Sequence, residues 1–425
     1  MEKYSSYKDS GVQWLGEIPS HWEVLRLGSY FSERKEKVSD KDYEPLSVTK
    51  NGIFPQLDNV AKTKDGDNRK LVRKNDFVIN SRSDRKGSSG VSKYDGSVSL
   101  INIVLEPRKA LEPSFCNYLL KSTEFIEEFY RNGHGIVADL WTTRYDEMKQ
   151  IKVAFPPIEE QQSMASYLDK ATAEIDKAIA QQQHMIDLLN ERKQIIIQRA
   201  VTKGLDENVE MKDSDVEWIG EIPKHWEVCK LKYLFKRIAD GTHFSPKTTN
   251  DGYPYLTAAD VRGIGIDYAS SKKISAKDYQ NLVSAGCKAY KGDILIVKDG
   301  ATTGRIGLKT DDIECVTLSS VAMLTPKDTK YTLYLMYMMM SDAMQKQITF
   351  SMSGAAMPRI TLIKLNNFYA IKPPVEEQNE IVKSIKLGLE PIEKAIMMSE
   401  KQMSLLQERK QIIISEVVTG KIKVS

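Results

Sequence analysis

The chain carries one sequence unit twice. WLGEIPSHWEV at Trp14–Val24 returns as WIGEIPKHWEV at Trp218–Val228, with nine of eleven positions identical at an offset of 204 residues. Two further pairs recur at an offset of 217, namely PPIEEQ at Pro156 with PPVEEQ at Pro373, and ERKQIII at Glu191 and at Glu408. Self-similarity on this scale means that one folding unit is built twice. We therefore expect two similar halves, the second with 13 extra residues between its anchors.

Each half changes character at its Pro-Pro pair. Before that pair lie short apolar runs of β type, broken by Gly, Asn and Asp. These runs are DFVIN at Asp76–Asn80, SVSLINIVL at Ser97–Leu105, GDILIV at Gly292–Val297 and VTLSSVAML at Val316–Leu324. After the prolines a long helical pattern begins, and its first turn carries two glutamates, which suit the positive end of a helix dipole. The sequence thus predicts two mixed α/β globules, each followed by a long helix.

Both helical segments carry an apolar seam in steps of three and four residues. In the first segment the seam is Met164, Leu168, Ala171, Ile175, Ile179, Gln182, Ile186, Leu189, Lys193, Ile196 and Ala200. In the second it is Ile381, Ile385, Gly388, Ile392, Ile396, Ser399, Met403, Leu406, Lys410, Ile413 and Val417. A seam sustained over about four heptads predicts a coiled coil in which the two helices are each other's partner. The alternative is two separate amphipathic helices, each lying on its own globule. Pro391 should kink or restart the second helix.

The chain has 61 basic and 58 acidic residues, so its net charge is only +3. A surface that binds nucleic acid must therefore come from a local concentration of basic residues. From Lys62 to Lys93 ten Lys or Arg face four Asp, a balance of +6, and from Gly286 to Thr310 five face two, a balance of +3. At the centre of these stretches, SRSDRKGSSG at Ser81–Gly90 aligns with KDGATTGR at Lys298–Arg305. Arg can fork onto guanine, hydroxyls can reach phosphates, and Gly permits close backbone approach. Each loop alone could be a solvated surface loop, but two equivalent loops with different residues favour paired recognition of DNA.

Catalytic motifs are missing from the sequence. There is no GxxxxGK[ST] phosphate loop, the nearest segment being Gly300–Gly304 followed by Arg305, and no FxGxG or NPPY pattern of an amino-methyltransferase. Asp139, Glu147 and Lys149 match the loose spacing of some nucleases, a pattern that is common by chance. The duplicated His21 and His225 each precede a tryptophan, and packing of the ring on that tryptophan explains them without catalysis.

Composition narrows the setting of the protein. The four cysteines form no CxxC pair and have no histidines at metal-ligand spacing, so we expect neither disulfides nor a metal site. Residues 1–20 do not resemble a secretory leader, and no apolar run is long enough to span a bilayer. We expect a cytoplasmic protein without membrane contact.

The order of globule, PPxEEQ-led helix, globule, PPxEEQ-led helix resembles the specificity subunit of Type I restriction-modification systems. The resemblance covers essentially the whole chain and rests on the doubled GEIPxHWEV and PPxEEQ segments. It implies a mixed α+β fold, in which two pseudo-symmetric α/β target-recognition domains are separated by two long helices that form an antiparallel coiled coil. The expected division is residues 1–156 and 204–372 for the recognition domains, and residues 157–203 and 373–425 for the spacer helices and C-terminal tail.

The resemblance also implies a non-catalytic role in sequence recognition. Each recognition domain would read one half of an asymmetric bipartite site in double-stranded DNA. DGTHFSPK at Asp240–Lys247 looks like a segment that recurs in one class of these domains, and the first globule has SERKEKV at Ser32–Val38 instead. The expected DNA-binding residues are Ser81, Arg82, Ser83, Arg85, Lys86, Ser88, Thr242, His243, Lys247, Lys298, Thr302, Thr303 and Arg305.

The chemistry would come from partner subunits. The resemblance implies two methyltransferase subunits that use S-adenosylmethionine and flip the target base, and optionally two restriction/translocase subunits that use ATP with Mg. No cofactor is expected on this chain. Two other classes remain open at this stage: a stand-alone tandem DNA-binding regulator, and a self-contained restriction enzyme, which would need a catalytic motif. The duplicated layout also predicts that the N-terminal segment up to Trp14 lies beside the C-terminal end near Val418.

Overall fold

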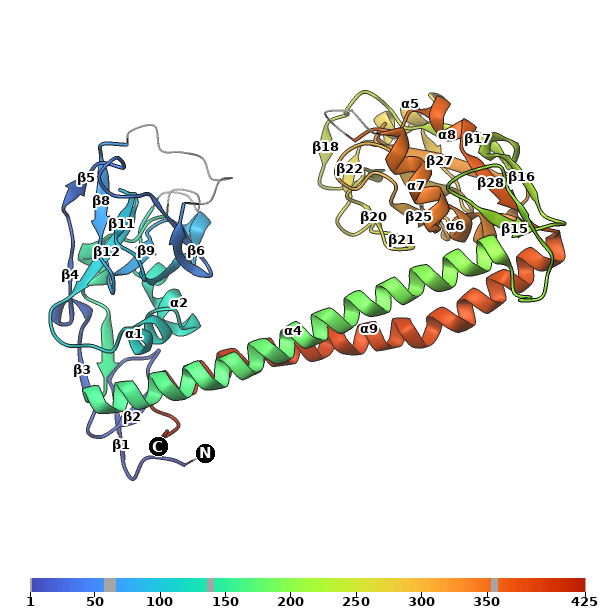
Figure 1. Cartoon of the computed structure of the whole chain (residues 1–425). Coiled ribbons are helices and arrows are strands. Elements are labelled where there is room, and N and C mark those ends of the chain that lie inside the picture. Colours follow the sequence, from blue (N-terminus) through green and yellow to red (C-terminus); the bar gives the residue numbers. More distant parts are fainter. Residues whose placement is uncertain (1, 57–65, 136–140, 353–357, 425) are drawn as a thin grey trace. The chain divides into compact units, whose positions relative to one another are not determined.

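The computed structural model describes residues 2–56, 66–135, 141–352 and 358–424. The chain divides into two compact units, one formed by residues 1–183 and 400–425 and the other by residues 184–399. Each unit holds one globule together with a part of both long helices (Figure 1). In the described ranges, no helix has both the length and the apolar composition needed to cross a membrane.

In its described residues, the globule of the first unit contains a four-stranded and a three-stranded sheet, together with three two-stranded sheets. Its strands are β1 (Tyr7–Asp9), β2 (Glu17–Pro19), β3 (Glu23–Arg26), β4 (Phe31–Glu33), β5 (Lys37–Val38), β6 (Leu46–Thr49), β7 (Gly52–Pro55), β8 (Arg69–Val72), β9 (Phe77–Asn80), β10 (Ser89–Val91), β11 (Gly96–Ser99), β12 (Asn102–Pro107) and β13 (Lys152–Phe155). Its helices are α1 (Pro113–Leu120), α2 (Thr123–Arg131) and α3 (Tyr145–Met148). The central sheet has the strand order β10-β9-β12-β4, and a second sheet has the order β11-β8-β5.

The globule of the second unit repeats this plan with additions. Its strands are β14 (Met211–Asp213), β15 (Glu221–Pro223), β16 (Glu227–Lys230), β17 (Phe235–Asp240), β18 (Thr248–Thr249), β19 (Tyr253–Leu256), β20 (Val261–Arg262), β21 (Gly265–Ile266), β22 (Lys272–Ile274), β23 (Lys288–Ala289), β24 (Ile294–Val297), β25 (Ile306–Leu308), β26 (Cys315–Thr317), β27 (Val321–Pro326) and β28 (Tyr369–Lys372). Its helices are α5 (Ala276–Ser284), α6 (Thr332–Met340), α7 (Asp342–Ser351) and α8 (Leu362–Asn367). The central sheet has the order β17-β27-β24-β25, which corresponds strand for strand to β4-β12-β9-β10 in the first unit.

The central strands β9 and β24 are buried along their whole length because both of their faces are covered. In β9, Phe77 and Ile79 join one core cluster and Val78 joins another. In β24, Ile294 and Ile296 likewise join one cluster, and the intervening Leu295 joins another. Successive side chains of a strand point to opposite faces, so a run such as FVIN or ILIV can be buried only between two layers. The predicted mixed α/β globules are confirmed, and each of the longer β-type runs proves to contain two strands.

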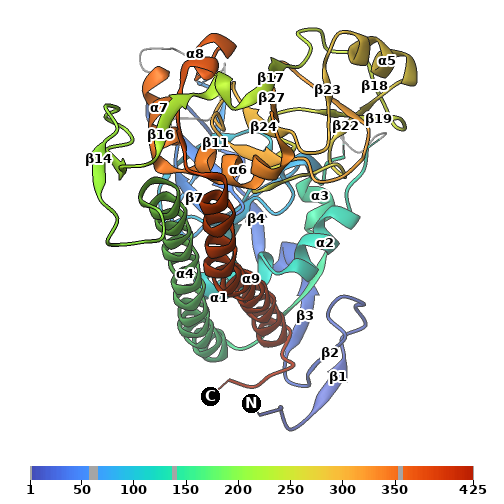
Figure 2. The same cartoon turned by 90° about the vertical axis from the view of Figure 1, so that its right-hand side faces the viewer.

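The two long helices are α4 (Ile158–Lys203) and α9 (Val375–Val418). They lie side by side (Figures 1 and 2). In the second unit Lys193 Nζ lies 2.9 Å from Glu393 Oε1, and Ile196 packs against Gly388, so the numbers rise along α4 as they fall along α9. In the first unit Lys410 Nζ lies 2.7 Å from an oxygen of Asp176. Every residue of the two expected seams is buried or half-buried, which confirms the coiled coil and excludes separate amphipathic helices.

Of the two outcomes expected at Pro391, a kink or a restart, the restart does not occur, because the helix continues through the proline. Helix α9 runs from Val375 to Val418 with Pro391 inside it. Proline leaves the carbonyl four residues earlier without its helical partner. Here that carbonyl belongs to Leu387, whose residue is 72% exposed, so water can satisfy it. The proline itself lies on the exposed face of the helix, away from the buried seam.

Each duplicated GEIPxHWEV segment receives the C-terminal end of one long helix. In the second unit Val201 and Trp226 belong to one core cluster, and Gly204 ends α4 in a left-handed conformation with φ of 73°. In the first unit Val418 and Trp22 share a cluster, and Gly420 has φ of 74°. Glycine tolerates this helix-ending conformation because it has no Cβ.

The two ends of the chain meet in the first unit, as expected. The Lys423 N–H donates to the Glu2 carbonyl at 2.9 Å, and the Tyr7 hydroxyl donates to the Lys421 carbonyl at 3.4 Å. The N and C labels lie close together in both views (Figures 1 and 2). This confirms that the N-terminal segment lies beside the C-terminal end.

Candidate nucleic-acid interface

The two basic loops occupy the same place in the two units. The Ser81–Ser88 loop joins β9 to β10, and the Lys298–Arg305 loop joins β24 to β25, so each loop is the tip of a hairpin in the central sheet. Each tip is held by an isolated antiparallel bridge to a later segment, Arg82 with Thr142 in one unit and Asp299 with Arg359 in the other. The partners of both bridges are related by the same offset of 217 residues. The duplication therefore conserves the backbone that carries the loops.

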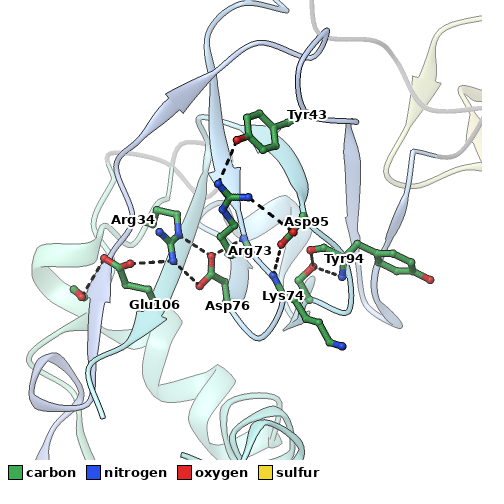
Figure 3. Close-up of polar contacts among 10 residues, drawn as sticks. Arg34, Tyr43, Arg73, Lys74, Asp76, Tyr94, Asp95 and Glu106 are labelled. Atoms are coloured by element: carbon green, nitrogen blue, oxygen red, sulfur yellow. Dashed lines mark hydrogen bonds and ion pairs between the residues drawn. The ribbon is translucent and has the colours of Figure 1, made fainter. Parts of the chain in front are cut away.

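A buried aspartate fixes the start of the hairpin in the first unit (Figure 3). Asp76, which is 1% exposed, accepts the Arg73 N–H at 2.8 Å and the Arg34 side chain at 2.8 and 3.2 Å. The hydrogen bond that Arg34 donates to Asp76 raises the pKa of the Arg34 guanidinium, and Glu106 pairs with the same guanidinium at 2.9 Å. Asn75 adopts a φ of 73° in this tight turn, a conformation that asparagine tolerates better than most residues.

The second unit builds the same turn with a neutral partner. Asp293, fully buried, accepts the Tyr290 N–H at 2.8 Å and the Thr325 hydroxyl at 2.6 Å. Burial raises the pKa of Asp293, because the charged carboxylate is removed from water. Gly292, at the position of Asn75, has φ of 88°. The turn geometry is thus common to both units, whereas the charge that supports it differs.

The first loop presents its cations to solvent. Arg82, Arg85 and Lys86 are exposed. Arg85 lies 3.7 Å from Asp84, and Lys86 pairs with Glu127 at 2.6 Å beside the Tyr130 ring. Ser81 and Ser83 are half-buried, and Ser88 is buried. Lys62 and Lys64 of the surrounding basic stretch lie outside the described residues.

Lys298 does not lie where the sequence analysis placed it. It is only 2% exposed, and its ammonium lies 3.2 Å from Asp240 and 3.6 Å from Asp299, so in this conformation it cannot contact DNA directly. Nothing in the local sequence indicates this burial, because a lysine in a loop is ordinarily solvated. The surroundings of Ser88 and Thr242, which are 5% and 9% exposed, limit their direct contacts in the same way.

The rest of the second loop faces the first spacer helix. Thr302 and Thr303 are half-buried, Arg305 is exposed, and the Arg305 guanidinium donates to the Val261 carbonyl at 3.1 Å. Residues 301–306 form one wall of a groove of about 790 Å³ whose other wall includes Asn190 and Gln194 of α4. The loop therefore lines a groove of its own unit with hydroxyl, amide and guanidinium groups.

The Asp240–Lys247 segment lies next to this loop. Asp240 ends β17 and pairs with the buried Lys298, which joins the two segments that sequence analysis had selected separately. His243 is exposed, with its side chain 68% accessible, and Lys247 is also exposed. Phe244, 70% exposed, was missed, although an aromatic residue within a polar segment is a signal for stacking on a ligand.

The residues considered for catalysis have structural partners. His21 Nε2 lies 2.8 Å from Glu160, and His225 Nε2 lies 2.6 Å from Glu377. Each histidine therefore contacts a carboxylate in the first turn of a long helix, which was not expected, and His225 also packs edge-on against Trp226 as expected, with ring centroids 6.4 Å apart. The same carboxylates accept the indole N–H of the neighbouring tryptophan, at 3.2 Å from Trp22 and 2.7 Å from Trp226.

The loose nuclease pattern does not assemble in the part of the chain that can be examined. Glu147 accepts the Arg144 N–H at 2.8 Å as a helix cap, and Lys149 pairs with Asp146 at 2.6 Å. Asp139 lies outside the described residues. Within the described ranges, no three His, Cys, Asp or Glu residues are grouped as metal ligands.

Comparison with known proteins agrees with this arrangement. The family model of the Type I restriction modification DNA specificity domain matches residues 19–183 and again residues 223–397. The chain belongs to this family. It therefore carries two specificity domains, each of which includes one of the hairpin loops and one PPxEEQ-led helix start, and it is a type I DNA specificity subunit.

Relatives match the chain along nearly its whole length. The MjaVIII specificity subunit of a Type I restriction enzyme from Methanocaldococcus jannaschii is 26% identical over 423 residues, covering 96% of this chain and 94% of the relative. The putative MjaX specificity subunit from the same organism is 24% identical, covering 96% of each chain. A chain in a solved structure of a type I R-M system shares the fold with a TM-score of 0.66 at 16% identity, covering 95% of this chain and 99% of that chain.

Proposed function

We propose that each specificity domain reads one half of an asymmetric bipartite site in double-stranded DNA. The observation that carries this proposal is the pair of equivalent hairpin tips, which share a backbone bridge and a supporting aspartate but differ in nearly every side chain. A common framework with different tips suits two readers of different sequences, because base edges in the major groove are distinguished by side-chain donors and acceptors.

The exposed groups of the two tips supply the proposed contacts. In the first domain they are Arg82, Arg85 and Lys86, with Ser83 beside them. In the second domain they are Arg305 of the tip and His243 and Lys247 of the adjacent Asp240–Lys247 segment, with Thr302 and Thr303 on the groove wall. The two long helices would set the distance between the half-sites. A helix rises by ~1.5 Å per residue and DNA by ~3.4 Å per base pair, so about two helical residues correspond to one base pair.

We assign no catalytic step to this chain. Base methylation would be carried out by two methyltransferase subunits with S-adenosylmethionine, and cleavage by optional restriction/translocase subunits with ATP and Mg. Adenine inside a duplex is out of reach of an active site, so the methyltransferase must extrude it. The specificity domains would position the enzyme at the site and leave the chemistry to it. A stand-alone tandem regulator is not favoured, because the relatives that match nearly the full length are specificity subunits of Type I restriction enzymes.

A duplicated apolar stripe on the helices supports two copies of the partner. Leu188 and Ile195 of α4 are 47% and 59% exposed, and Leu405 and Ile412 of α9 are 56% and 47% exposed. The two pairs are related by the offset of 217 residues, and within each pair the residues are seven apart. Seven residues make two helical turns, so both members of a pair face the same way and present an apolar strip about 10 Å long. Each unit thus offers an equivalent surface to a helix of one partner copy.

The apolar stripe predicts how many methyltransferase subunits a variant of this chain binds. The double change Leu188→Glu with Ile195→Glu should release one methyltransferase copy, and Leu405→Glu with Ile412→Glu should release the other. Native mass spectrometry of the purified complex would then show one methyltransferase per chain instead of two. The controls are Gln194→Glu on α4 and Gln411→Glu on α9. Each adds one negative charge, half of what a double change adds, at a neighbouring exposed polar position and should retain both copies. Retention of both copies in the double variants would refute the docking surface.

DNA reading is tested with the assembled methyltransferase complex. Mapping the methylated sites in the source genome should reveal a two-part sequence with an unread gap. Arg82→Ala should lower affinity by about 1 to 3 kcal/mol when a bidentate base contact is lost, and it should relax only one half-site. Methylation of a single continuous sequence, or relaxation of both halves by this one substitution, would contradict independent reading by the two domains.

A further inference from the structure

The second specificity domain holds a row of contacting charged and polar side chains at its recognition hairpin. It runs through Arg359, Asp299, Lys298, Asp240 and His243. Lys298, with a side chain 3% exposed, lies 3.2 Å from Asp240 and 3.6 Å from Asp299. Asp299 in turn lies 3.1 Å from Arg359 Nε, and Asp240 lies 3.7 Å from His243 Nε2. Both outer side chains are exposed, Arg359 by 57% and His243 by 68%.

The buried ammonium of Lys298 needs a reason, because removing a charge from water is costly unless it is paired. Its position between the two carboxylates of Asp240 and Asp299 provides both the pairing and the reason. Two uncompensated carboxylates on a surface that faces phosphates would repel DNA. Lys298 supplies one positive charge between them from the inside, and Arg359 supplies a second one to Asp299 from the outside.

The backbone fixes this arrangement tightly. The Ile360 N–H donates to the Lys298 carbonyl at 2.8 Å, and the Gly300 N–H donates to the Pro358 carbonyl at 3.0 Å, so the loop and the Arg359 segment form one short ladder. On the other side, a Cβ at Gly241 would lie 1.9 Å from the Thr317 carbonyl oxygen, which shows how closely the Asp240–Phe244 segment is packed. The charged side chains therefore start from a rigid platform.

In both domains the equivalent backbone bridge includes one exposed arginine, but the loop supplies it in the first domain and the later segment supplies it in the second. In the first domain the arginine is Arg82, on the loop, and its bridge partner is Thr142. In the second domain the loop residue is Asp299, and the arginine is its partner Arg359. The Thr142 hydroxyl donates to the Ser81 hydroxyl oxygen at 3.2 Å, where the second domain has the charged Lys298. The guanidinium is retained at the bridge although the residue that supplies it changes.

We propose that Arg359 is a base-reading residue of the second specificity domain and that Lys298 and Asp299 are its positioning residues. Asp299 contacts the Nε of Arg359, and in the described part of the chain no other contact occupies its two terminal amino groups. A guanidinium held in this way presents a fork that matches two acceptors on one base edge, as on guanine. This inference rests on the proposed function of the domain and names a residue that reads the second half-site.

The test uses the complete chain assembled with its methyltransferase subunits and a library of duplexes with single base-pair changes in each half-site. Arg359→Ala should lower affinity for the intact site by about 5- to 150-fold and should abolish discrimination at one base pair of the second half-site. Arg359→Lys keeps the charge but loses the fork, so it should relax the same base pair. The first half-site should be read as before by both variants.

Asp299→Asn tests positioning separately from contact. It frees the guanidinium without removing it, so discrimination at the same base pair should weaken while the melting temperature of the complex stays close to that of the wild type. The matched control is Arg262→Ala, another exposed arginine of this unit that pairs with a carboxylate, Asp267 at 3.0 Å. It should leave base preference unchanged.

Two results would overturn the inference while leaving the proposed function intact. One is full discrimination by Arg359→Ala at every base pair of the second half-site. The other is an equal loss of affinity for all sequences with a reduced salt dependence, which would make Arg359 a phosphate contact. Failure of the wild-type complex to prefer any sequence would instead overturn the proposed function itself.

Discussion

The contact between each long helix and its duplicated tryptophan allows a quantitative test in the second unit. Glu377, in the first turn of α9, accepts the Trp226 indole N–H at 2.7 Å and lies 2.6 Å from His225. Trp226 is fully buried, so Glu377→Ala would leave its indole donor without its carboxylate acceptor. A hydrogen bond to a charged group contributes about 1.5 to 3 kcal/mol, and a buried donor without a partner costs about as much. The free energy of unfolding of this unit should fall by about that amount.

Glu376 is the matched control for this experiment. It lies in the same first turn of α9, where its charge interacts with the helix dipole as that of Glu377 does, and it is exposed. Glu376→Ala should cost only the dipole contribution, about 0.3 to 1 kcal/mol. The difference between the variants therefore isolates the contact with Trp226 and His225.

Thermal unfolding, together with hydrogen exchange of the first turns of α9, measures the effect in the unit concerned. For a unit of this size a loss of 1.5 to 3 kcal/mol corresponds to a melting temperature lower by roughly 3 to 12 °C. Glu160→Ala and Glu159→Ala repeat the comparison in the first unit, where Glu160 also accepts a hydrogen bond from Tyr4. Equal destabilisation by Glu376→Ala and Glu377→Ala would refute the reasoning.

Two further predictions concern the recognition hairpin and its surroundings. Gly241→Ala should destabilise the second unit severely, since its Cβ would lie 1.9 Å from a backbone oxygen. Gly265→Ala, whose nearest neighbour would lie 4.0 Å away, should destabilise it only mildly. Expression level and melting temperature measure the two effects, and equal destabilisation by both variants would contradict the close packing at Gly241. Burial raises the pKa of Asp293, so the folded chain binds this proton more tightly than the unfolded chain does. We compare the unfolding free energy of the wild type with that of Asp293→Asn. This difference should fall as the pH rises from the pKa of Asp293 in the unfolded chain to its raised pKa in the folded chain, and it should stay low at higher pH. Denaturant titrations across this pH range measure the difference, and a difference independent of pH would exclude an ionising Asp293.

The architecture was accessible from the sequence because its signals are local and repeated. The two PPxEEQ segments marked the helix starts, and the three-and-four spacing of the seam marked the face that each helix buries. The place of the two hairpin loops followed from alignment of the two copies at an offset of 217. Each of these features depends on residues close together in the chain, or on the comparison of one copy with the other.

The side-chain environments were decided by contacts between distant residues. Lys298 was expected to be exposed, yet Asp240, 58 positions earlier, and Asp299 bury and neutralise it. Arg359 was overlooked because it stands beside the loop only through a bridge to Asp299, 60 positions earlier. His21 was assigned to tryptophan packing, but its main partner is Glu160, on a helix that begins 137 residues later.

The difference between the features that the sequence predicts and those that only the folded structure decides has a physical cause. Periodicity, turn residues and repetition are properties of the chain itself, so they fix the helices, the strands and the doubling of the fold. The exposure and charge partners of a side chain depend on what the folded chain brings against it from elsewhere. The sequence determined that this protein has two equivalent domains and two long helices that pair, and the tertiary structure alone decided that Lys298 is buried between Asp240 and Asp299 while Arg359 stands exposed beside the second loop.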